Sequence, residues 1–216
     1  MEVNRRHWDE VAERHPATPF YSNAASRLRA GDAWLRQIET RELGDVRGKR
    51  MLHLQCHLGQ ESAAWAQLGA EVTAVDFSAN ALQGARALAA DAQVDIRFIE
   101  ANVLQLDALL DDRFDIVYTS WGVLGWLPDI ARWAQVVQHF LHPGGVLYLA
   151  EFHPVGWMLD DESQEVRLKY SYFSDLPLVE ESDGSYADRA MHVENRRTYN
   201  YYYCLLYTSP SPRDRQ

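Results

Sequence analysis

The segment Gln55–Gln60 and the acid Asp76 have the residue types and spacing of a ligand site. Asp76 ends a short apolar run, where a carboxylate can accept hydrogen bonds from the two hydroxyls of a ribose. Segment 55–60 reads QCHLGQ and follows another apolar run, with one glycine and no lysine or arginine. Pyrophosphate-binding turns instead use several glycines, which allow the backbone to approach the phosphates closely. The pattern therefore favours a nucleoside-containing ligand without phosphate.

The elements around these residues predict how they are positioned. Apolar runs at Met51–Leu54 and Val72–Val75 flank Ser62–Leu68, which has helical spacing. This is the β-α-β pattern of a parallel sheet with helices on its faces. Ligands of such sheets bind outside the carboxyl ends of the strands, where segment 55–60 and Asp76 both fall.

The chain continues to alternate between strands and helices. Helices are predicted at Ala79–Ala90 and Pro128–Leu141, and strands at Val94–Glu100, Phe114–Ser120 and Val146–Phe152. The order of these strands and helices along the chain predicts a Rossmann-like α/β fold with three layers, α/β/α, and a mostly parallel sheet.

The first motif resembles that of the class I S-adenosylmethionine-dependent methyltransferases. The family pattern is hydrophobic-hydrophobic-Asp-hydrophobic-Gly-x-Gly-x-Gly, and residues 51–59 read MLHLQCHLG. His53 stands in place of the acid, Gln55 and His57 replace two glycines, and Gly59 is kept. A bacterial subset of the family with an HLQCH-x-G motif is similar. The segments FDIVYTSWGVLGWLPD and FLHPGGVLYLAEF resemble the family's fourth and fifth motifs.

The resemblance implies an S-adenosylmethionine-dependent methyltransferase that acts on an unidentified small molecule. It implies cofactor contacts from the first motif and from the residues that follow the later strands: His53, Gln55, Cys56, His57, Gly59, Asp76, Phe77, Asn102, Val103 and Ser120. Two other functions stay open. One is an NAD(P)-dependent oxidoreductase on a related sheet, and the other is a non-catalytic S-adenosylmethionine-binding module.

Several of these residues also have a purely structural interpretation. His53 is a candidate core histidine, and Asp76 could cap the helix that begins near Ser78. Phe77 could pack on the adenine or on the core. His53, Cys56 and His57 could also be metal ligands, but the sequence has no second cluster at zinc spacing. We therefore expect no metal site.

The resemblance divides the chain into four parts, in order: an N-terminal helical extension covering the site (1–45), a cofactor-binding methyltransferase core (46–154), a substrate-side insertion (155–203) and a tail (204–216). Helices are predicted in the extension at Asn4–Glu13 and Ala25–Leu43. In the insertion, Val166–Phe173 and His192–Tyr203 alternate like strands, and Leu178–Asp188 has the composition of a loop.

Aromatic residues outside the first motif are candidates for contacts with the methyl acceptor: Trp8, Tyr21, Trp121, Trp157 and Tyr199. Each could equally pack on the core or belong to an ordinary strand. His153 follows the fifth predicted strand and is a candidate base if the acceptor must lose a proton. A loop histidine held by a hydrogen bond is the alternative.

The composition limits the possible classes of protein. With 216 residues, 47% of them hydrophobic, the chain can form one domain with a sizeable core. Its net charge of −10 argues against nucleic acid as a partner. It has no apolar run that could span a membrane, no signal peptide, and no disulfide framework from its two cysteines. We therefore expect a cytoplasmic protein whose oligomeric state is open.

The C-terminal tail looks foreign to the rest of the chain. Cys204–Asp214 is similar to one reading frame of a transposase adapter used in sequencing libraries, so we expect the natural chain to be cut near Tyr203; a genuine polar terminus is the alternative. The family's sheet has seven strands, and the last two form an antiparallel hairpin against the fifth. Little sequence remains for them. We expect a sheet that lacks this hairpin, with an exposed edge at Val146–Phe152.

Overall fold

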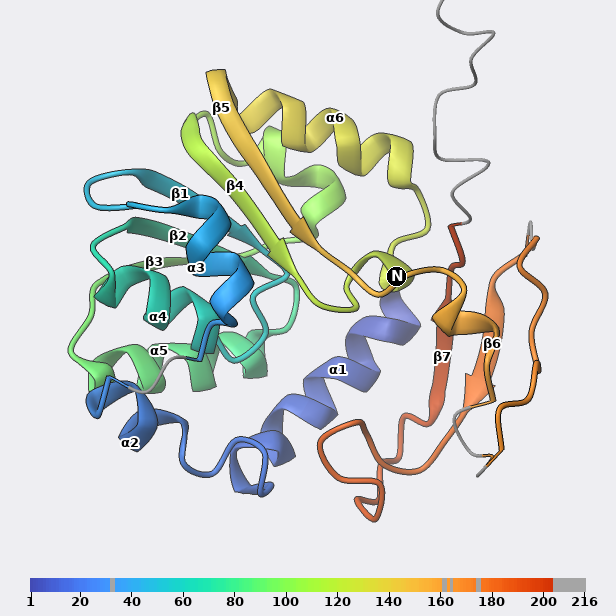
Figure 1. The fold of residues 1–216 in the computed structure, drawn as a ribbon. Coiled ribbons are helices and arrows are strands. Elements are labelled where there is room, and N and C mark those ends of the chain that lie inside the picture. Colours follow the sequence, from blue (N-terminus) through green and yellow to red (C-terminus); the bar gives the residue numbers. More distant parts are fainter. Residues whose placement is uncertain (32–33, 161–162, 164, 174–175, 204–216) are drawn as a thin grey trace, which may run out of the picture.

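The computed structural model describes residues 1–31, 34–160, 163, 165–173 and 176–203, so the tail 204–216 lies outside the described residues. A parallel five-stranded sheet forms the centre of the molecule, with the strand order β3-β2-β1-β4-β5 (Figure 1). Its strands are β1 (Arg50–Leu54), β2 (Glu71–Asp76), β3 (Ile96–Glu100), β4 (Phe114–Ser120) and β5 (Leu141–Ala150). The predicted α/β fold is confirmed.

Helices cover both faces of the sheet and make three layers (Figure 1). One face packs against α4 (Gln60–Gln67) and α5 (Ala79–Ala92). The other packs against α6 (Ile130–Phe140) and the 3-10 helix η2 (Val103–Ala108). Because both faces are buried at the centre of the sheet, β1, β2 and β4 have mostly buried residues on both sides and do not alternate between buried and exposed.

Strand β1 shows how the two faces are divided. Met51 belongs to the core on the α4 side, and His53 bonds to Ser62 of α4. Leu52 and Leu54 belong to the core on the α6 side. This alternation follows from the two-residue period of a strand.

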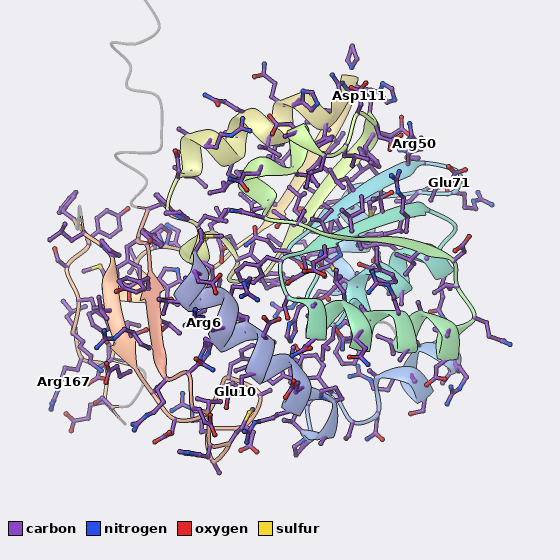
Figure 2. The ribbon with its side chains drawn as sticks, turned by 180° about the vertical axis from the view of Figure 1, so that it is seen from behind. Arg6, Glu10, Arg50, Glu71, Asp111 and Arg167 are labelled. Carbon is purple, nitrogen blue, oxygen red and sulfur yellow. The ribbon has the colours of Figure 1, made fainter. Side chains whose placement is uncertain are left out.

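The N-terminal helix α1 (Glu2–Arg14) crosses the carboxyl-terminal edge of the sheet, between α5 and the C-terminal strands (Figures 1 and 2). The Asn4 side chain forms two hydrogen bonds of 2.8 Å with the backbone of Tyr199. The Glu10 carboxylate accepts hydrogen bonds from the backbone N–H groups of Glu194 and Asn195. The ends of the described chain are thus joined over the sheet.

The second predicted helix of the extension is wrong as a single element. The segment instead forms two short helices, α2 (Ala24–Arg29) and α3 (Gln37–Leu43). Gly31 has a φ of +70°, and its N–H bonds to the Leu28 carbonyl, so the chain leaves the helix at this point. The helical spacing of the apolar residues did not reveal this break.

The insertion also differs from its prediction. Segment Val166–Phe173 forms only an isolated bridge, between Leu168 and Leu159, and no regular strand. The predicted loop begins with a strand, β6 (Leu178–Glu181), which pairs antiparallel with β7 (Arg197–Asn200). Alternation alone does not make a strand, because a strand also needs a partner for its hydrogen bonds.

No helix in the described part of the chain is both long enough and apolar enough to cross a bilayer.

Strand β5 lies at one edge of the sheet and, within the described residues, pairs only with β4. Strands β6 and β7 form a separate sheet and do not cover this edge (Figure 1). Val146, Leu147 and Leu149 are 49%, 38% and 40% exposed. An exposed apolar edge strand offers unpaired backbone groups to another chain.

We expect the β5 edge to promote association between copies of this chain. Leu149→Lys should shift sedimentation-velocity profiles toward the monomer at high protein concentration, because a charged side chain opposes edge-to-edge pairing. Leu109→Lys is the control, since Leu109 is 67% exposed and follows η2, outside any strand. Equal association of Leu149→Lys and the unmodified chain would contradict this role of the edge.

Candidate functional site

The turn after β1 keeps the backbone of a glycine-rich loop although two of its glycines are replaced. Gln55, His57 and Gly59 have φ values of +57°, +50° and +74°. The left-handed conformation costs a residue with a side chain about 1–2 kcal/mol. A Cβ on Gly59 would lie 3.0 Å from the Ala85 Cβ, so this position needs a glycine on steric grounds as well. The turn therefore has the shape that the motif predicts.

Asp76 connects this turn to the start of α5. Its Oδ2 accepts a hydrogen bond of 2.8 Å from the His57 N–H, and its Oδ1 accepts one of 2.9 Å from the Ser78 N–H. Burial raises the pKa of Asp76 to about 6, although these hydrogen bonds act in the opposite direction. The cap of α5 is Ser78, whose Oγ accepts the Ala81 N–H. Asp76 is thus a buried carboxylate at the carboxyl end of β2, and it does not cap the helix.

A cavity of about 330 Å³ opens beside the ends of β2 and β3. Phe77 and Asn102, both predicted to contact a cofactor, line this cavity. Its remaining lining residues lie at the start of α1 and at the end of β3 or directly beside these elements: Met1, Glu2, Arg5, Glu100 and Ala101. Val103 is 4% exposed and belongs to the core on the α6 side. Of the two residues predicted to contact the cofactor after the third strand, Asn102 therefore lines the cavity and Val103 does not.

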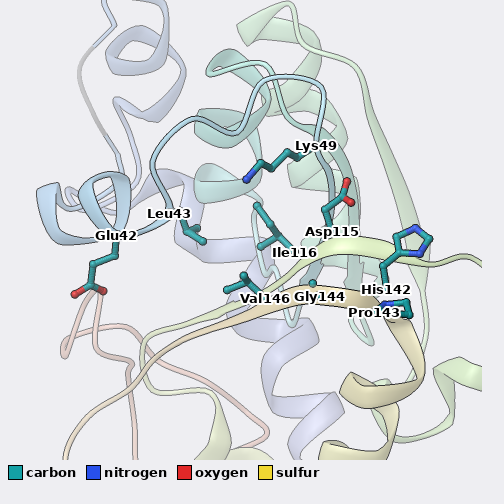
Figure 3. Close-up of a pocket in the computed structure, with 10 residues that line it drawn as sticks. Glu42, Leu43, Lys49, Asp115, Ile116, His142, Pro143, Gly144 and Val146 are labelled. Atoms are coloured by element: carbon teal, nitrogen blue, oxygen red, sulfur yellow. The ribbon is translucent and has the colours of Figure 1, made fainter.

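Another cavity, of about 350 Å³, lies at the opposite end of the sheet (Figure 3). Lys49 precedes β1, Asp115 is near the start of β4, and His142 is at the start of β5. No residue predicted for the site lines it. Because ligands of parallel sheets bind at the carboxyl ends of the strands, we place the candidate site at the 330 Å³ cavity and the adjoining turn.

Helix α1 is attached directly to this edge. The Asp9 carboxylate accepts hydrogen bonds from Ser78 Oγ–H, at 2.7 Å, and from the Arg5 guanidinium, at 2.6 Å. The Asn80 side chain also donates to the Asp9 carbonyl. The N-terminal extension therefore covers the end of β2 through polar contacts as well as packing.

Two of the residues predicted to contact the methyl acceptor, Trp8 and Tyr21, both pack against the turn. Their ring centroids lie 5.4 Å and 5.9 Å from the His57 ring, both edge-on. Trp126, which sequence reasoning missed, packs edge-on against Trp8 at 5.0 Å. We call Trp8, Tyr21, His57 and Trp126 the turn cluster.

A chain of hydrogen bonds closes over the turn cluster. His57 Nε2 lies 2.8 Å from His15 Nδ1, and His15 Nε2 lies 2.8 Å from Ser185 Oγ. The hydroxyls of Tyr21 and Tyr186 are also hydrogen-bonded. Sequence reasoning missed His15, Ser185 and Tyr186. The only local signal for His15 was its place before a proline, which indicated a helix end.

The other three residues predicted to contact the methyl acceptor are not part of the turn cluster. The Arg36 guanidinium lies over the Trp121 ring, with its Cζ atom 3.6 Å from the ring centroid. Trp157 packs edge-on against Phe152. Phe152 also contacts Trp121, so these rings form a second aromatic group. Tyr199 lies in β7, where its backbone pairs with Asn4.

Four further predicted residues are His53, Cys56, Ser120 and His153, and two of them, His53 and His153, form hydrogen bonds within the protein. His53 is 1% exposed, its Nδ1 lies 2.7 Å from Ser62 Oγ, and its ring packs edge-on against Tyr118. This geometry favours the core interpretation of His53. Cys56 is 2% exposed, and Ser120, at the end of β4, is 8% exposed. His153 is exposed, and its Nδ1 accepts the Val155 N–H, as expected for a loop histidine.

The part of the chain that the structure describes contains no group of three or more histidine, cysteine, aspartate or glutamate residues that could hold a metal ion.

Residues 52–147 match the sequence profile of a family described as "Methyltransferase domain". This segment is a methyltransferase domain. It contains β2, β3 and β4, most of β1 and β5, the turn at 55–59, Asp76 and Asn102.

Curated relatives of the methyltransferase domain include a demethylmenaquinone methyltransferase of Clavibacter sepedonicus. It is 34% identical over 146 residues, which are 67% of this chain and 56% of the relative. A ubiquinone biosynthesis O-methyltransferase of Alkalilimnicola ehrlichii is 35% identical over 103 residues, 48% of this chain and 41% of the relative. The chain thus spans about half the length of the curated relatives it matches.

The fold extends beyond the methyltransferase domain in a solved structure, the complex of DhpI with SAH. The alignment covers 94% of this chain and 79% of DhpI, with a TM-score of 0.57 and 18% sequence identity. At this identity the likeness concerns the fold.

Three histidines, His15, His53 and His57, predict that the protein loses stability in acid. Burial lowers the pKa of His53 and His57 to about 3 and that of His15 to about 4, from an ordinary value of 6.5. The stability that these neutral imidazoles contribute is therefore complete well above pH 6.5 and is lost as the pH falls through 6.5 toward about 4 for His15 and about 3 for His53 and His57. For His53 alone, linkage gives about 2 kcal/mol between pH 7 and pH 5.

Thermal unfolding at pH 7 and pH 5 checks this expectation. His53→Gln should lower the unfolding temperature at pH 7 but lose less stability on acidification than the unmodified chain. His142→Gln is the control, because His142 is exposed and lies at the other end of the sheet. An equal acid-induced loss in His53→Gln and His142→Gln would rule out His53 as a source of the pH dependence.

Proposed function

We propose that this protein is an S-adenosylmethionine-dependent methyltransferase whose acceptor is a small molecule. The observation that carries the proposal is the buried Asp76 carboxylate at the carboxyl end of β2, directly before Phe77, which lines the 330 Å³ cavity. It lies within the methyltransferase domain 52–147. A carboxylate at this position suits a ribose diol. Phe77 and Asn102 line the same cavity and suit an adenine.

The turn fits the methionine part of this cofactor better than it fits a pyrophosphate. It presents the side chains of Gln55 and His57 where a dinucleotide site would have glycines. The Oε1 atom of Gln55 is buried and accepts no hydrogen bond from the described residues, so it can receive a donor from a ligand. These features support S-adenosylmethionine over a nicotinamide dinucleotide.

When bound, S-adenosylmethionine supplies a methyl group activated by a positively charged sulfur. The protein then has to orient the acceptor and exclude water. We assign this task to the turn cluster and to the segments that close over it, His15 from the extension and Ser185 and Tyr186 from the insertion. This assigns residues 1–45 to the cover of the site and residues 155–203 to its acceptor side.

Incubation with methyl-labelled S-adenosylmethionine tests the proposed activity. Phenols and quinols are the first acceptors to try, because the curated relatives are named for ubiquinone biosynthesis and for demethylmenaquinone. Appearance of S-adenosylhomocysteine together with a labelled product would support methyl transfer. Tight S-adenosylmethionine binding without a labelled product from any metabolite extract would favour a binding module. Tighter binding of NADH than of S-adenosylmethionine would favour an oxidoreductase.

Asp76→Ala should weaken the binding of S-adenosylhomocysteine at least about tenfold. Hydrogen bonds to a charged group are worth about 1.5–3 kcal/mol, and each 1.4 kcal/mol is about tenfold in affinity. Calorimetry measures the change, and Asp91→Ala is the matched control, since Asp91 is an exposed acid on α5. An unchanged affinity in Asp76→Ala would remove Asp76 from the site.

Asn102→Ala should weaken the binding of S-adenosylhomocysteine and of 5′-methylthioadenosine by similar factors. The reason is that we assign Asn102 to contact the adenosine that both ligands contain. Asn23→Ala is the control, since Asn23 is exposed and precedes α2. Competition binding with the two ligands gives the comparison. If Asn102→Ala impaired only the use of the acceptor, Asn102 would belong to a different subsite.

A further inference from the structure

Glu61 is a partly buried carboxylate to which the proposed function gives no role. It lies in the first turn of α4, two residues after Gly59. Apart from its own backbone N–H, none of the described residues donates a hydrogen bond to it, and none forms an ion pair with it. Burial raises its pKa to about 7. A carboxylate in this setting is stabilised by a cation or by hydrogen-bond donors.

The charge of Glu61 acts on groups around the turn. Burial is the largest cause of the raised pKa values of Cys56, Tyr21 and Tyr118, and the Glu61 carboxylate adds to the rise in each. These residues come from the turn, from the segment after η1 (His15–Ala17) and from β4. Glu61 is therefore close to the place where the extension, the turn and the end of β4 meet.

The charged groups near Glu61 do not neutralise it. Arg36 acts on Glu61 electrostatically, but its guanidinium lies over the face of Trp121. Glu39, a second buried acid, raises the pKa of Glu61 further and has its own donors, the Tyr118 hydroxyl and the Arg36 N–H. The imidazoles of the turn are neutral at pH 7, because burial lowers the pKa of His57 to about 3.

The turn before α4 contains an acceptor oxygen without a donor among the described residues. The Nε2 of Gln55 donates to the Val123 carbonyl at 3.1 Å, which leaves Oε1 as the free atom of this amide. The aromatic rings of Trp8 and Tyr21 pack on the turn at His57. Acceptor oxygens together with aromatic faces favour a ligand that is positively charged and has several N–H donors.

We propose that Glu61 binds a primary ammonium group of a ligand held at this turn, an inference that rests on the proposed methyltransferase function. An ammonium has three donors, which suits a carboxylate and the Gln55 Oε1 together. Two ligands of such an enzyme can carry this group. One is the methionine part of the cofactor, and the other is an acceptor that is an amine.

The test compares Glu61→Gln with Glu71→Gln by calorimetry. Glu71 is exposed at the start of β2, at the end of the sheet away from the turn (Figure 2), so its variant is the matched control. The cofactor-side probes are S-adenosylhomocysteine, which has the ammonium group, and 5′-methylthioadenosine, which lacks it. The acceptor-side probes, added with saturating S-adenosylhomocysteine, are phenethylammonium and the neutral 2-phenylethanol.

We expect Glu61→Gln to lower the affinity for one ammonium-bearing probe at least about tenfold. The affinity for its ammonium-free counterpart should change less than about twofold. Loss on the cofactor side assigns Glu61 to the methionine part, and loss on the acceptor side assigns it to an amine acceptor. Glu61→Asp, which keeps the charge, should bind the affected probe more tightly than Glu61→Gln. Glu71→Gln should match the unmodified chain throughout.

Two results would overturn the proposal. One is an equal loss for both members of a pair, which would mean that Glu61 shapes the pocket and does not bind the ammonium. The other is no loss for either ammonium-bearing probe, including the case in which the unmodified chain does not bind phenethylammonium. If the unmodified chain binds neither S-adenosylhomocysteine nor 5′-methylthioadenosine, the proposed function itself fails, and this inference fails with it.

Discussion

The buried carboxylate of Asp76 is the interaction on which the ligand edge of this protein depends. It accepts the N–H groups of His57 and Ser78, and so holds the turn after β1 against the start of α5. Helix α1 is attached at the same place, because Ser78 also donates to Asp9. If Asp76 is removed, two backbone donors lose their acceptor, and a buried donor without a partner costs about 1–3 kcal/mol. The shape of the turn and the attachment of α1 are therefore linked to one side chain.

The turn itself combines a glycine-like backbone with functional side chains. A glycine at position 55 or 57 would adopt the left-handed conformation without strain, but it would provide no side chain. Gln55 instead reaches the Val123 carbonyl after β4, and His57 reaches His15 in the extension. The turn thus connects two strands of the sheet and also holds the segment that covers them. Its conformational strain is compensated by contacts that a glycine-rich loop cannot make.

The cover of the site is made from the two ends of the described chain. Asn4 and Glu10 of α1 bond to the backbone of residues 194–199, and His15 bonds to Ser185. All of these residues lie outside the methyltransferase domain 52–147. The segments to which we assign the acceptor side therefore lie largely outside the shared domain. The 330 Å³ cavity, by contrast, is formed mainly where β2 and β3 end.

The sequence by itself determined the parallel sheet and its ligand edge, because strand and helix periods are local and parallel strands share one carboxyl edge. It placed Asp76 and Asn102 at that edge. Only the tertiary structure decided that His53 faces the core, because a two-residue period does not say which face of a strand meets which layer. It alone brought His15 to His57, 42 residues away, and to Ser185, 170 residues away. Such contacts depend on how the whole chain packs, and they leave no periodic signal in the sequence.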